Sequence, residues 1–247
     1  MPWTALQRLP RVPDLVLAAA AALAFTSCSH DPAEREYMSA LHGEETGMGR
    51  KEQLARLDRA IALQPRRSWY RETHAIYSID QRQFDRAAAD LDTAIQLADR
   101  PYLHFLRAMV RCERGAYEAS LPDFDHAIKE QPDNAQFYRG RSLALSRVGR
   151  FDDALADADR LVAMAPMQAE GHYARGVALS GLARWPEAVD AFDESIRLRP
   201  DLVYAWRERA AAFAMLGDSV RAQSDHQEVA KKSEESVAAI SEDPFRY

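Results

Sequence analysis

The chain repeats itself with a period of 34 residues, and this repetition constrains the fold more than any other feature. The stretch "RFDDALADADRLVAMAP" at residues 150–166 returns in altered form as "RWPEAVDAFDESIRLRP" at residues 184–200. Proline marks the same site at Pro65 and Pro132, and Asp99 stands at that site in the repeat between them. A period of roughly 20–50 residues is typical of stacked architectures, because one short unit cannot bury its apolar side alone.

Each period has the same internal order. An apolar helical run is followed by a turn, which glycine marks at Gly115, Gly149 and Gly217, and then by a second helical run that ends near proline. In the second runs a small residue is followed four positions later by another residue on the same helix face, as in Ala188 and Phe192. Two amphipathic helices per period predict an all-α fold built from stacked helix pairs.

This order of residues resembles the tetratricopeptide repeat, a helix–turn–helix unit, over about residues 34–232. A degenerate copy at 34–67 precedes the others. Clear copies begin near Ser68, Pro101, Ala135 and Ala169, and a fifth, beginning near Val203, matches in its first helix.

The resemblance implies a right-handed α-solenoid of about five to six repeats. We expect the repeat array to occupy residues 50–232. The polar residues 233–247 would then form a capping helix or tail at the open end of the solenoid, since terminal repeats need a polar outer face.

The composition and motifs exclude several classes of function. The net charge of −6 provides no basic surface for nucleic acid, and two cysteines cannot build a disulfide framework. We find no phosphate-binding loop, nucleophile elbow or zinc-ligand spacing in the sequence. His104 and His172 lie two periods apart, too far in a solenoid to share a metal ion. We therefore expect no enzyme activity, no cofactor and no metal site.

The first 27 residues resemble the signal peptide of a bacterial lipoprotein. Two arginines precede the uncharged run at residues 15–25, which is too short to span a bilayer, and small residues lead to Cys28. Phe25 occupies a position where leucine is usual. The resemblance implies cleavage before Cys28 and lipidation of that cysteine. Ordinary secretion with cleavage at another site, or a transit peptide, are the alternatives.

The residues after Cys28 carry two further expectations from that resemblance. Ser29 replaces the aspartate that often retains Gram-negative lipoproteins in the inner membrane, which favours the outer membrane with the repeats facing the periplasm. The polar, glycine-containing residues 28–49 would serve as a tether and hold the start of the degenerate repeat.

Arginines recur at one repeat position, at Arg107, Arg141, Arg175 and Arg209. In three of these repeats an aspartate follows sixteen residues later, and His74 with Asp90 keeps the same offset. A charged side chain near a packing seam needs a partner, and arginine favours a bidentate carboxylate. The sequence predicts structural ion pairs between the two helices of a repeat, with a ligand-binding ladder as the alternative. The predicted pairs are Arg107–Asp123, Arg141–Asp157 and Arg209–Asp225.

The resemblance also implies a partner-binding groove, because first helices line the concave surface in this family. Second and fifth positions of each repeat project into that groove, and ninth and thirteenth positions add to it. Here these residues mix aromatic rings with arginines, as protein interfaces do. They are Trp69, Glu72, Tyr102, Phe105, Met109, Gln136, Arg139, Leu143, Arg147, Glu170, Tyr173, Tyr204 and Arg207.

These features together favour a non-enzymatic adaptor, anchored by lipid in the bacterial cell envelope. Its ligand would be an extended or helical protein segment with apolar anchors and some acidic character. The alternative is a structural module that self-associates into homo-oligomers, secreted or periplasmic without a lipid anchor. Enzyme activity remains the third class, for which the sequence offers no chemistry.

Overall fold

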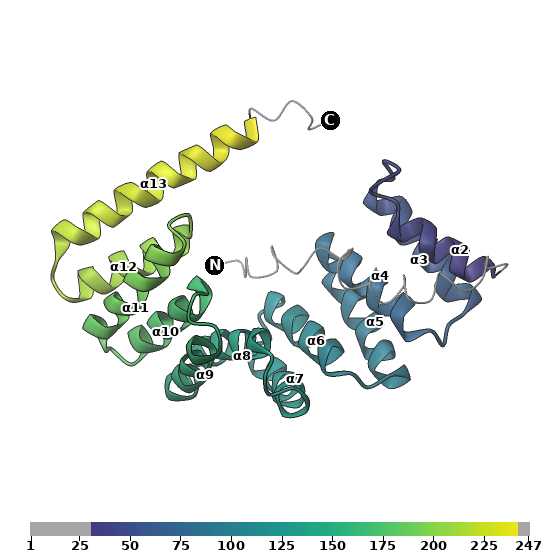
Figure 1. The fold of residues 1–247 in the computed structure, drawn as a ribbon, viewed down its shortest axis with the longest axis horizontal. Coiled ribbons are helices and arrows are strands. Elements are labelled where there is room, and N and C mark those ends of the chain that lie inside the picture. The colour runs from purple at the N-terminus through teal and green to yellow at the C-terminus, as the bar shows by residue number, and fades with distance from the viewer. Residues whose placement is uncertain (1–30, 242–247) are drawn as a thin grey trace. The chain divides into compact units, whose positions relative to one another are not determined.

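The computed structural model describes residues 31–241 of the chain, with side chains described up to residue 234. Every regular element in this range is a helix, and short turns join the helices (Figure 1). The helices are α2 (Pro32–Leu41), α3 (Arg50–Leu63), α4 (Ser68–Asp80), α5 (Phe84–Leu97), α6 (Pro101–Glu113), α7 (Tyr117–Glu130), α8 (Ala135–Arg147), α9 (Phe151–Met164), α10 (Ala169–Gly181), α11 (Trp185–Leu198), α12 (Val203–Met215) and α13 (Ser219–Ser241).

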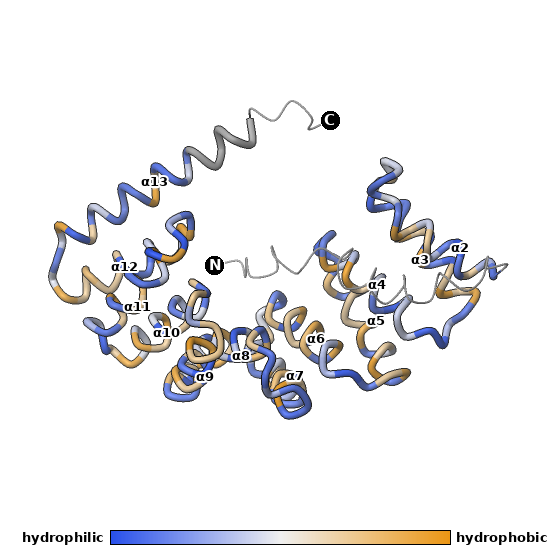
Figure 2. Tube along the Cα trace, viewed as in Figure 1, coloured by the Kyte–Doolittle hydropathy of each residue, from blue (hydrophilic) through white to orange (hydrophobic). Residues whose placement is uncertain are grey.

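The helices pack as consecutive pairs, which makes the fold an all-α tetratricopeptide-type solenoid. The first helices of the last five pairs begin at the residues where the sequence repeats begin, Ser68, Pro101, Ala135, Ala169 and Val203. Figure 2 shows hydrophobic and hydrophilic residues alternating along the helices, as expected for helices that are buried on one side. The period of 34 residues therefore predicts the positions of these helices closely.

The turn inside each of the last five pairs has one residue in the left-handed region. Gly115, Gly149 and Gly217 occupy this position with φ of 76°, 83° and 78°. Arg82 and Ala183 take the equivalent positions with φ of 56° and 57°. Glycine adopts this conformation without steric cost, whereas a side chain is strained there. Two of the five turns are therefore less favourable than the glycine-marked ones.

The chain divides into two compact units on either side of the Gln131–Pro132 bond. The first contains α2–α7 and the second contains α8–α13, three helix pairs each. Within the first unit, α3 packs on α4 and α5 packs on α6. Within the second, α9 packs on α10 and α11 on α12, and the first helices α8, α10 and α12 also contact one another in sequence order.

Small residues on both helices of a pair leave room for the larger side chains of the core. Ala188 of α11 is fully buried in a cluster with Phe192 and with Phe213 of α12. A Cβ atom added at Gly176 of α10 would lie only 2.5 Å from the ring of Phe192. Glycine at this position therefore makes room for the aromatic ring that fills the interior of the repeat.

Helices are present at both ends of the expected repeat array. Residues 32–41 form α2, which packs on α3 and buries Tyr37, in the segment where the degenerate repeat was expected to begin. Asp31 caps this helix by accepting a hydrogen bond from the backbone N–H of Ala33 at 2.9 Å, and Pro32 suits its first turn. At the other end, α13 continues without a break past residue 232, into the residues that were expected to form a capping helix or tail.

Cys28, the signal peptide expected before it and residues 242–247 lie outside the described residues. Among the helices that the structure does describe, none has both the length and the apolarity needed to cross a membrane.

Candidate partner-binding surface

The structure brings together each of the predicted arginine–aspartate pairs. In every case the arginine of the first helix donates two hydrogen bonds to the aspartate of the second, from Nε to Oδ2 and from Nη2 to Oδ1. The two distances are 2.9 and 2.7 Å for Arg107–Asp123, 2.7 and 2.7 Å for Arg141–Asp157, and 2.9 and 2.6 Å for Arg209–Asp225. The aspartates are buried, so this bidentate geometry satisfies carboxylates that would otherwise be costly to desolvate.

Some of these arginines also reach the preceding repeat, which the sequence did not indicate. Arg107 Nη1 lies 2.7 Å from Oδ1 of Asp92 on α5, and Arg209 Nη1 lies 2.5 Å from Oδ1 of Asp193 on α11. Arg175, whose repeat has alanine at the aspartate position, pairs backward with Asp159 of α9 at 2.8 Å. These arginines therefore link neighbouring repeats and are engaged in structure, which disfavours a ligand-binding ladder.

The pKa of Asp123 shows that its pair is stabilising. Burial alone raises the pKa of a carboxyl group. Hydrogen bonds from Arg107 and His104 outweigh that effect, with Arg111 adding a favourable charge, and the pKa of Asp123 lies below its ordinary value. The folded protein therefore favours the ionised carboxylate.

The first unit contains five of the expected groove residues, and two of them are core residues. Phe105 is 3% exposed and Met109 is 1% exposed, so neither side chain is available to a partner. The ring of Phe105 packs toward Phe124 of α7, with ring centroids 6.2 Å apart. The side chains at positions five and nine of this repeat are therefore buried, and they do not line a groove as expected.

The other three expected groove residues of this unit differ in accessibility. Glu72 is buried and paired with Arg100. Trp69 is half-buried, with the guanidinium of Arg67 4.8 Å from its ring centroid. Tyr102 is half-buried, and burial raises its pKa to about 12. Trp69 and Tyr102 therefore remain the candidates for partner contact on this unit.

The second unit gathers most of its expected residues into one cluster on α8, α10 and α12. The rings of Tyr173 and Tyr204 meet edge to face with centroids 4.5 Å apart. Arg199, from the turn before α12, donates to the hydroxyl of Tyr204 at 3.2 Å and lies 2.7 Å from Oε1 of Glu170. We call this set the Arg–Tyr cluster; it consists of Arg139, Arg147, Glu170, Tyr173, Arg199, Tyr204, Arg207 and Glu208.

Partial burial shifts the pKa of two charged members of the Arg–Tyr cluster, Arg139 and Glu208. Burial lowers the pKa of Arg139, and the negative charge of Glu170 opposes that shift. Burial raises the pKa of Glu208, and Arg147 and Arg207 oppose that shift. Charges held in partly desolvated positions interact more strongly with a partner than fully solvated ones do.

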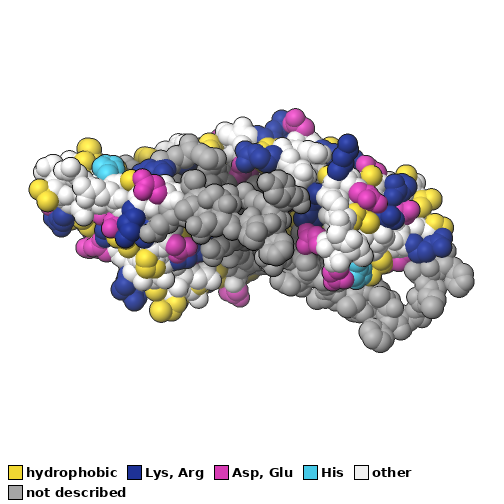
Figure 3. Space-filling model, turned by 90° about the horizontal axis from the view of Figure 1, so that it is seen from above, with side chains coloured by type: hydrophobic (Ala, Val, Ile, Leu, Met, Phe, Trp, Pro, Cys, Tyr) yellow, Lys and Arg dark blue, Asp and Glu magenta, His cyan; other side chains and the backbone are white. Residues whose placement is uncertain are grey.

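The Arg–Tyr cluster carries an excess of positive charge. It contains four arginines and two glutamates. On the face of the molecule seen in Figure 3, basic and acidic side chains are interspersed. The protein as a whole has a net charge of −6, but the local excess of positive charge in the cluster would favour a negatively charged ligand at this surface. Two other expected groove residues of this unit are not part of the cluster. Gln136 is exposed at the start of α8, and Leu143 is half-buried.

Sequence reasoning missed two members of the Arg–Tyr cluster, Arg199 and Glu208. Arg199 lies in a linker between repeats, where the repeat pattern carries no expectation. Glu208 did leave a signal, because the equivalent positions of the other repeats hold only small or apolar residues, all buried. These residues are Thr73, Leu106, Gly140 and Ala174.

A family model described as tetratricopeptide repeat matches four overlapping segments of the chain, residues 73–135, 105–166, 139–202 and 173–235. Together they span more than half of the 247 residues. The chain belongs to the tetratricopeptide repeat family. Proteins of this family are generally non-catalytic scaffolds, and the fold supports a role in protein–protein interaction. No curated protein sequence matches the chain.

Solved structures of other tetratricopeptide repeat proteins share the fold. One, from Parabacteroides merdae, superposes with a TM-score of 0.73 at 16% identity, covering 81% of this chain and 80% of that one. YrrB, described as having an unusual peptide-binding site, gives 0.61 at 17% identity and covers 76% of this chain and 95% of its own. MamA from Desulfovibrio magneticus gives 0.61 at 16% identity, with 68% and 96% covered. At these identities the similarity concerns the fold alone.

Proposed function

We propose that the protein is a non-enzymatic adaptor whose Arg–Tyr cluster binds an acidic protein segment with aromatic or apolar anchors. The observation that carries this proposal is the excess of arginine around the Tyr173–Tyr204 pair, in a cluster that draws residues from α8, α10 and α12. The edge of the Tyr173–Tyr204 pair offers a surface for an apolar side chain. The surrounding excess of arginine favours carboxylates, and tyrosine and arginine are the residue types most enriched in binding hot spots.

A peptide segment is the ligand class that fits best. A protein of similar fold, YrrB, is described as binding a peptide. In this chain the cluster draws residues from three helices, so a bound segment would contact more than one repeat. The binding free energy would then come from several weak contacts and not from one deep pocket.

A panel of labelled peptides tests this function by fluorescence anisotropy. The peptides would share one aromatic content and differ in whether aspartate or lysine fills the remaining positions. We expect the acidic peptides to bind more tightly, and added salt to weaken their binding, because screening reduces the attraction. Equal binding of acidic and basic peptides would contradict the proposal.

We further propose that the adaptor is held at the outer membrane of a bacterial envelope through a lipid on Cys28, facing the periplasm. The support is the sequence alone: a short apolar run after two arginines, followed by small residues before Cys28, with Ser29 after it. Cys28 lies outside the described residues.

Self-association is the second candidate function, and exposed apolar side chains at the α12–α13 turn favour it. Val220 is 78% exposed, and Met215 and Leu216 lie exposed beside the same turn. Static light scattering over a dilution series would distinguish the two functions. A dimer that dissociates in a Val220→Ser variant would favour the self-associating structural module. A protein that stays monomeric at all concentrations would exclude self-association and favour the adaptor function.

A further inference from the structure

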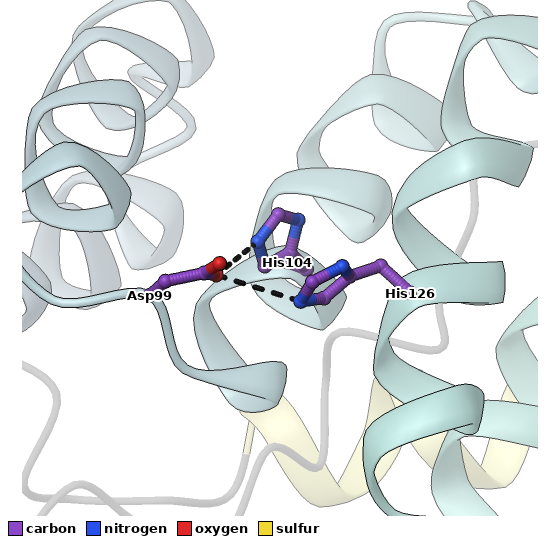
Figure 4. Close-up of side chains that lie close together, drawn as sticks. All are labelled: Asp99, His104 and His126. Carbon is purple, nitrogen blue, oxygen red and sulfur yellow. Dashed lines mark hydrogen bonds and ion pairs between the residues drawn. The ribbon is translucent and has the colours of Figure 1, made fainter.

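Two histidines and an aspartate of the first unit converge at the junction between α5 and α6. Asp99 lies in the turn before α6, His104 lies in the first turns of α6, and His126 lies on α7. Figure 4 shows the two imidazole rings stacked, each with one nitrogen directed at the Asp99 carboxylate. The ring centroids are 3.9 Å apart.

The three possible ligand atoms of this group lie close together. Asp99 Oδ1 lies 2.7 Å from His104 Nε2 and 3.4 Å from His126 Nε2, and all three atoms lie within 4.8 Å of one another. A tetrahedral ion bound at about 2.0–2.1 Å sets its ligand atoms roughly 3.3 Å apart. The Asp99–His126 distance already meets this value. Asp99 is exposed in a turn, so its carboxylate can open the shorter distance.

The other nitrogen of His104 provides a second, independent indication. His104 Nδ1 donates to Oδ1 of Asp123 at 2.9 Å. Arg107 holds that carboxylate with two hydrogen bonds, and Arg111 adds a third at 2.8 Å. A histidine that binds a metal through one nitrogen almost always donates the other N–H to a carboxylate or carbonyl, which fixes its ring and tautomer. His104 is held in this arrangement, with Nε2 toward Asp99.

We propose that Asp99, His104 and His126 bind a divalent transition-metal ion of the zinc class. Two imidazoles with one carboxylate favour zinc and its neighbours over calcium or magnesium, which prefer sets of oxygen ligands. Three protein ligands leave one tetrahedral position for water or for a donor from another molecule. The ion would tie the α5–α6 turn to both helices of the following repeat.

This combination is particular to one junction among the repeats that the structure describes. The site of Asp99 holds proline at Pro132, Pro166 and Pro200. At the junction that contains Pro166, His172 occupies the position of His104 and instead hydrogen-bonds through Nε2 to the carbonyl of Pro166 at 2.9 Å. His172 therefore offers a matched control, with the same residue type at the same repeat position and no converging ligands.

Metal titration of the whole chain, after treatment with a chelator, tests the proposal. We expect one equivalent of Zn²⁺ to bind and to raise the melting temperature, because the ion binds only the folded arrangement. His126→Gln and Asp99→Ala should each weaken Zn²⁺ affinity by about tenfold or more, while His172→Gln leaves it unchanged. His126 and Asp99 are not buried, so both variants should fold, and circular dichroism without metal would verify this.

Three outcomes would overturn the metal site. The first is no Zn²⁺ binding at micromolar concentrations, in which case the group is an ion pair of Asp99 with the two histidines. The second is binding that survives both His126→Gln and Asp99→Ala. The third is an equal loss of affinity in His172→Gln, which would indicate unspecific binding by surface histidines. Loss of binding in a protein that still captures acidic peptides would separate this site from the proposed adaptor function.

Discussion

Arg141 and Asp157 join the two helices of one repeat through two hydrogen bonds, Nε to Oδ2 and Nη2 to Oδ1, each 2.7 Å long. The carboxylate is buried and the guanidinium is partly exposed. Exposed ion pairs contribute little to the free energy of unfolding, whereas removing one partner of a buried pair lowers it strongly. We expect the contribution of this half-buried pair to lie between these two values.

Arg141→Ala should therefore lower the free energy of unfolding by about 2 kcal/mol, since it leaves the Asp157 carboxylate buried without this partner. The double variant Arg141→Ala with Asp157→Ala should recover part of the loss. Urea denaturation of the four proteins completes the double-mutant cycle. Strictly additive losses would mean that the two side chains do not interact.

The stability contribution of Asp123 should disappear in acid. Its pKa is lower in the folded than in the unfolded protein, so its contribution is present above the unfolded pKa of about 4 and is lost as the pH falls through the folded value. The difference in unfolding free energy between the wild type and Asp123→Asn should be large at pH 7 and shrink below about pH 4. A difference that stays constant down to pH 3 would rule out this linkage.

The conformations of the turn residues predict that two substitutions change the stability of the protein in opposite directions. Gly149→Ala should destabilise by about 1 kcal/mol, because alanine is strained at a φ of 83° even though no other atom lies within 4 Å of the added Cβ. Ala183→Gly should stabilise by roughly 0.5–1 kcal/mol, because it relieves the same strain at the equivalent turn. Thermal denaturation would check both, and effects of the same sign would contradict the assignment.

Lipidation predicts that Cys28→Ala releases the protein from membranes and leaves a precursor of higher mass. The physical reason is that the acyl chains supply the membrane affinity and that cleavage depends on the modified cysteine. Fractionation of cells and mass spectrometry of the product would measure both. A variant that still sediments with membranes and yields no soluble pool would exclude the tether.

The repeat period predicts first-helix starts such as Ser68 and Val203 because each repeat contains its own turn and helix signals. The offset of sixteen residues predicts contacts such as Arg141–Asp157 for a similar reason, since both residues belong to one repeat. The bounds of α2 could not be predicted as closely, because the degenerate copy at 34–67 has lost most of the shared pattern, although Asp31 and Pro32 mark the start of the helix.

Contacts between repeats and between distant positions could not be derived from the period. Arg107 reaches Asp92 of the preceding repeat, and His126 joins His104 across two helices. Both contacts depend on how neighbouring helices pack. The burial of Phe105 follows from the same cause, because the repeat position alone does not determine whether a side chain turns toward the second helix or toward solvent.

The proposed adaptor function rests on the positive excess of the Arg–Tyr cluster, and one pair of substitutions tests it most directly. Arg147 and Arg207 are exposed members of the cluster, so replacing both by glutamine removes two charges with little effect on packing. Arg160→Gln with Arg197→Gln is the matched control, because both arginines are exposed on second helices of the same unit.

Fluorescence anisotropy with an acidic, aromatic peptide would compare the two double variants with the wild type, and circular dichroism would verify equal helicity. We predict that Arg147→Gln with Arg207→Gln weakens peptide binding at least about tenfold, equivalent to roughly 1.4 kcal/mol, while the control retains wild-type affinity. Equal affinities of all three proteins for the peptide would contradict the proposal that the Arg–Tyr cluster is the binding surface.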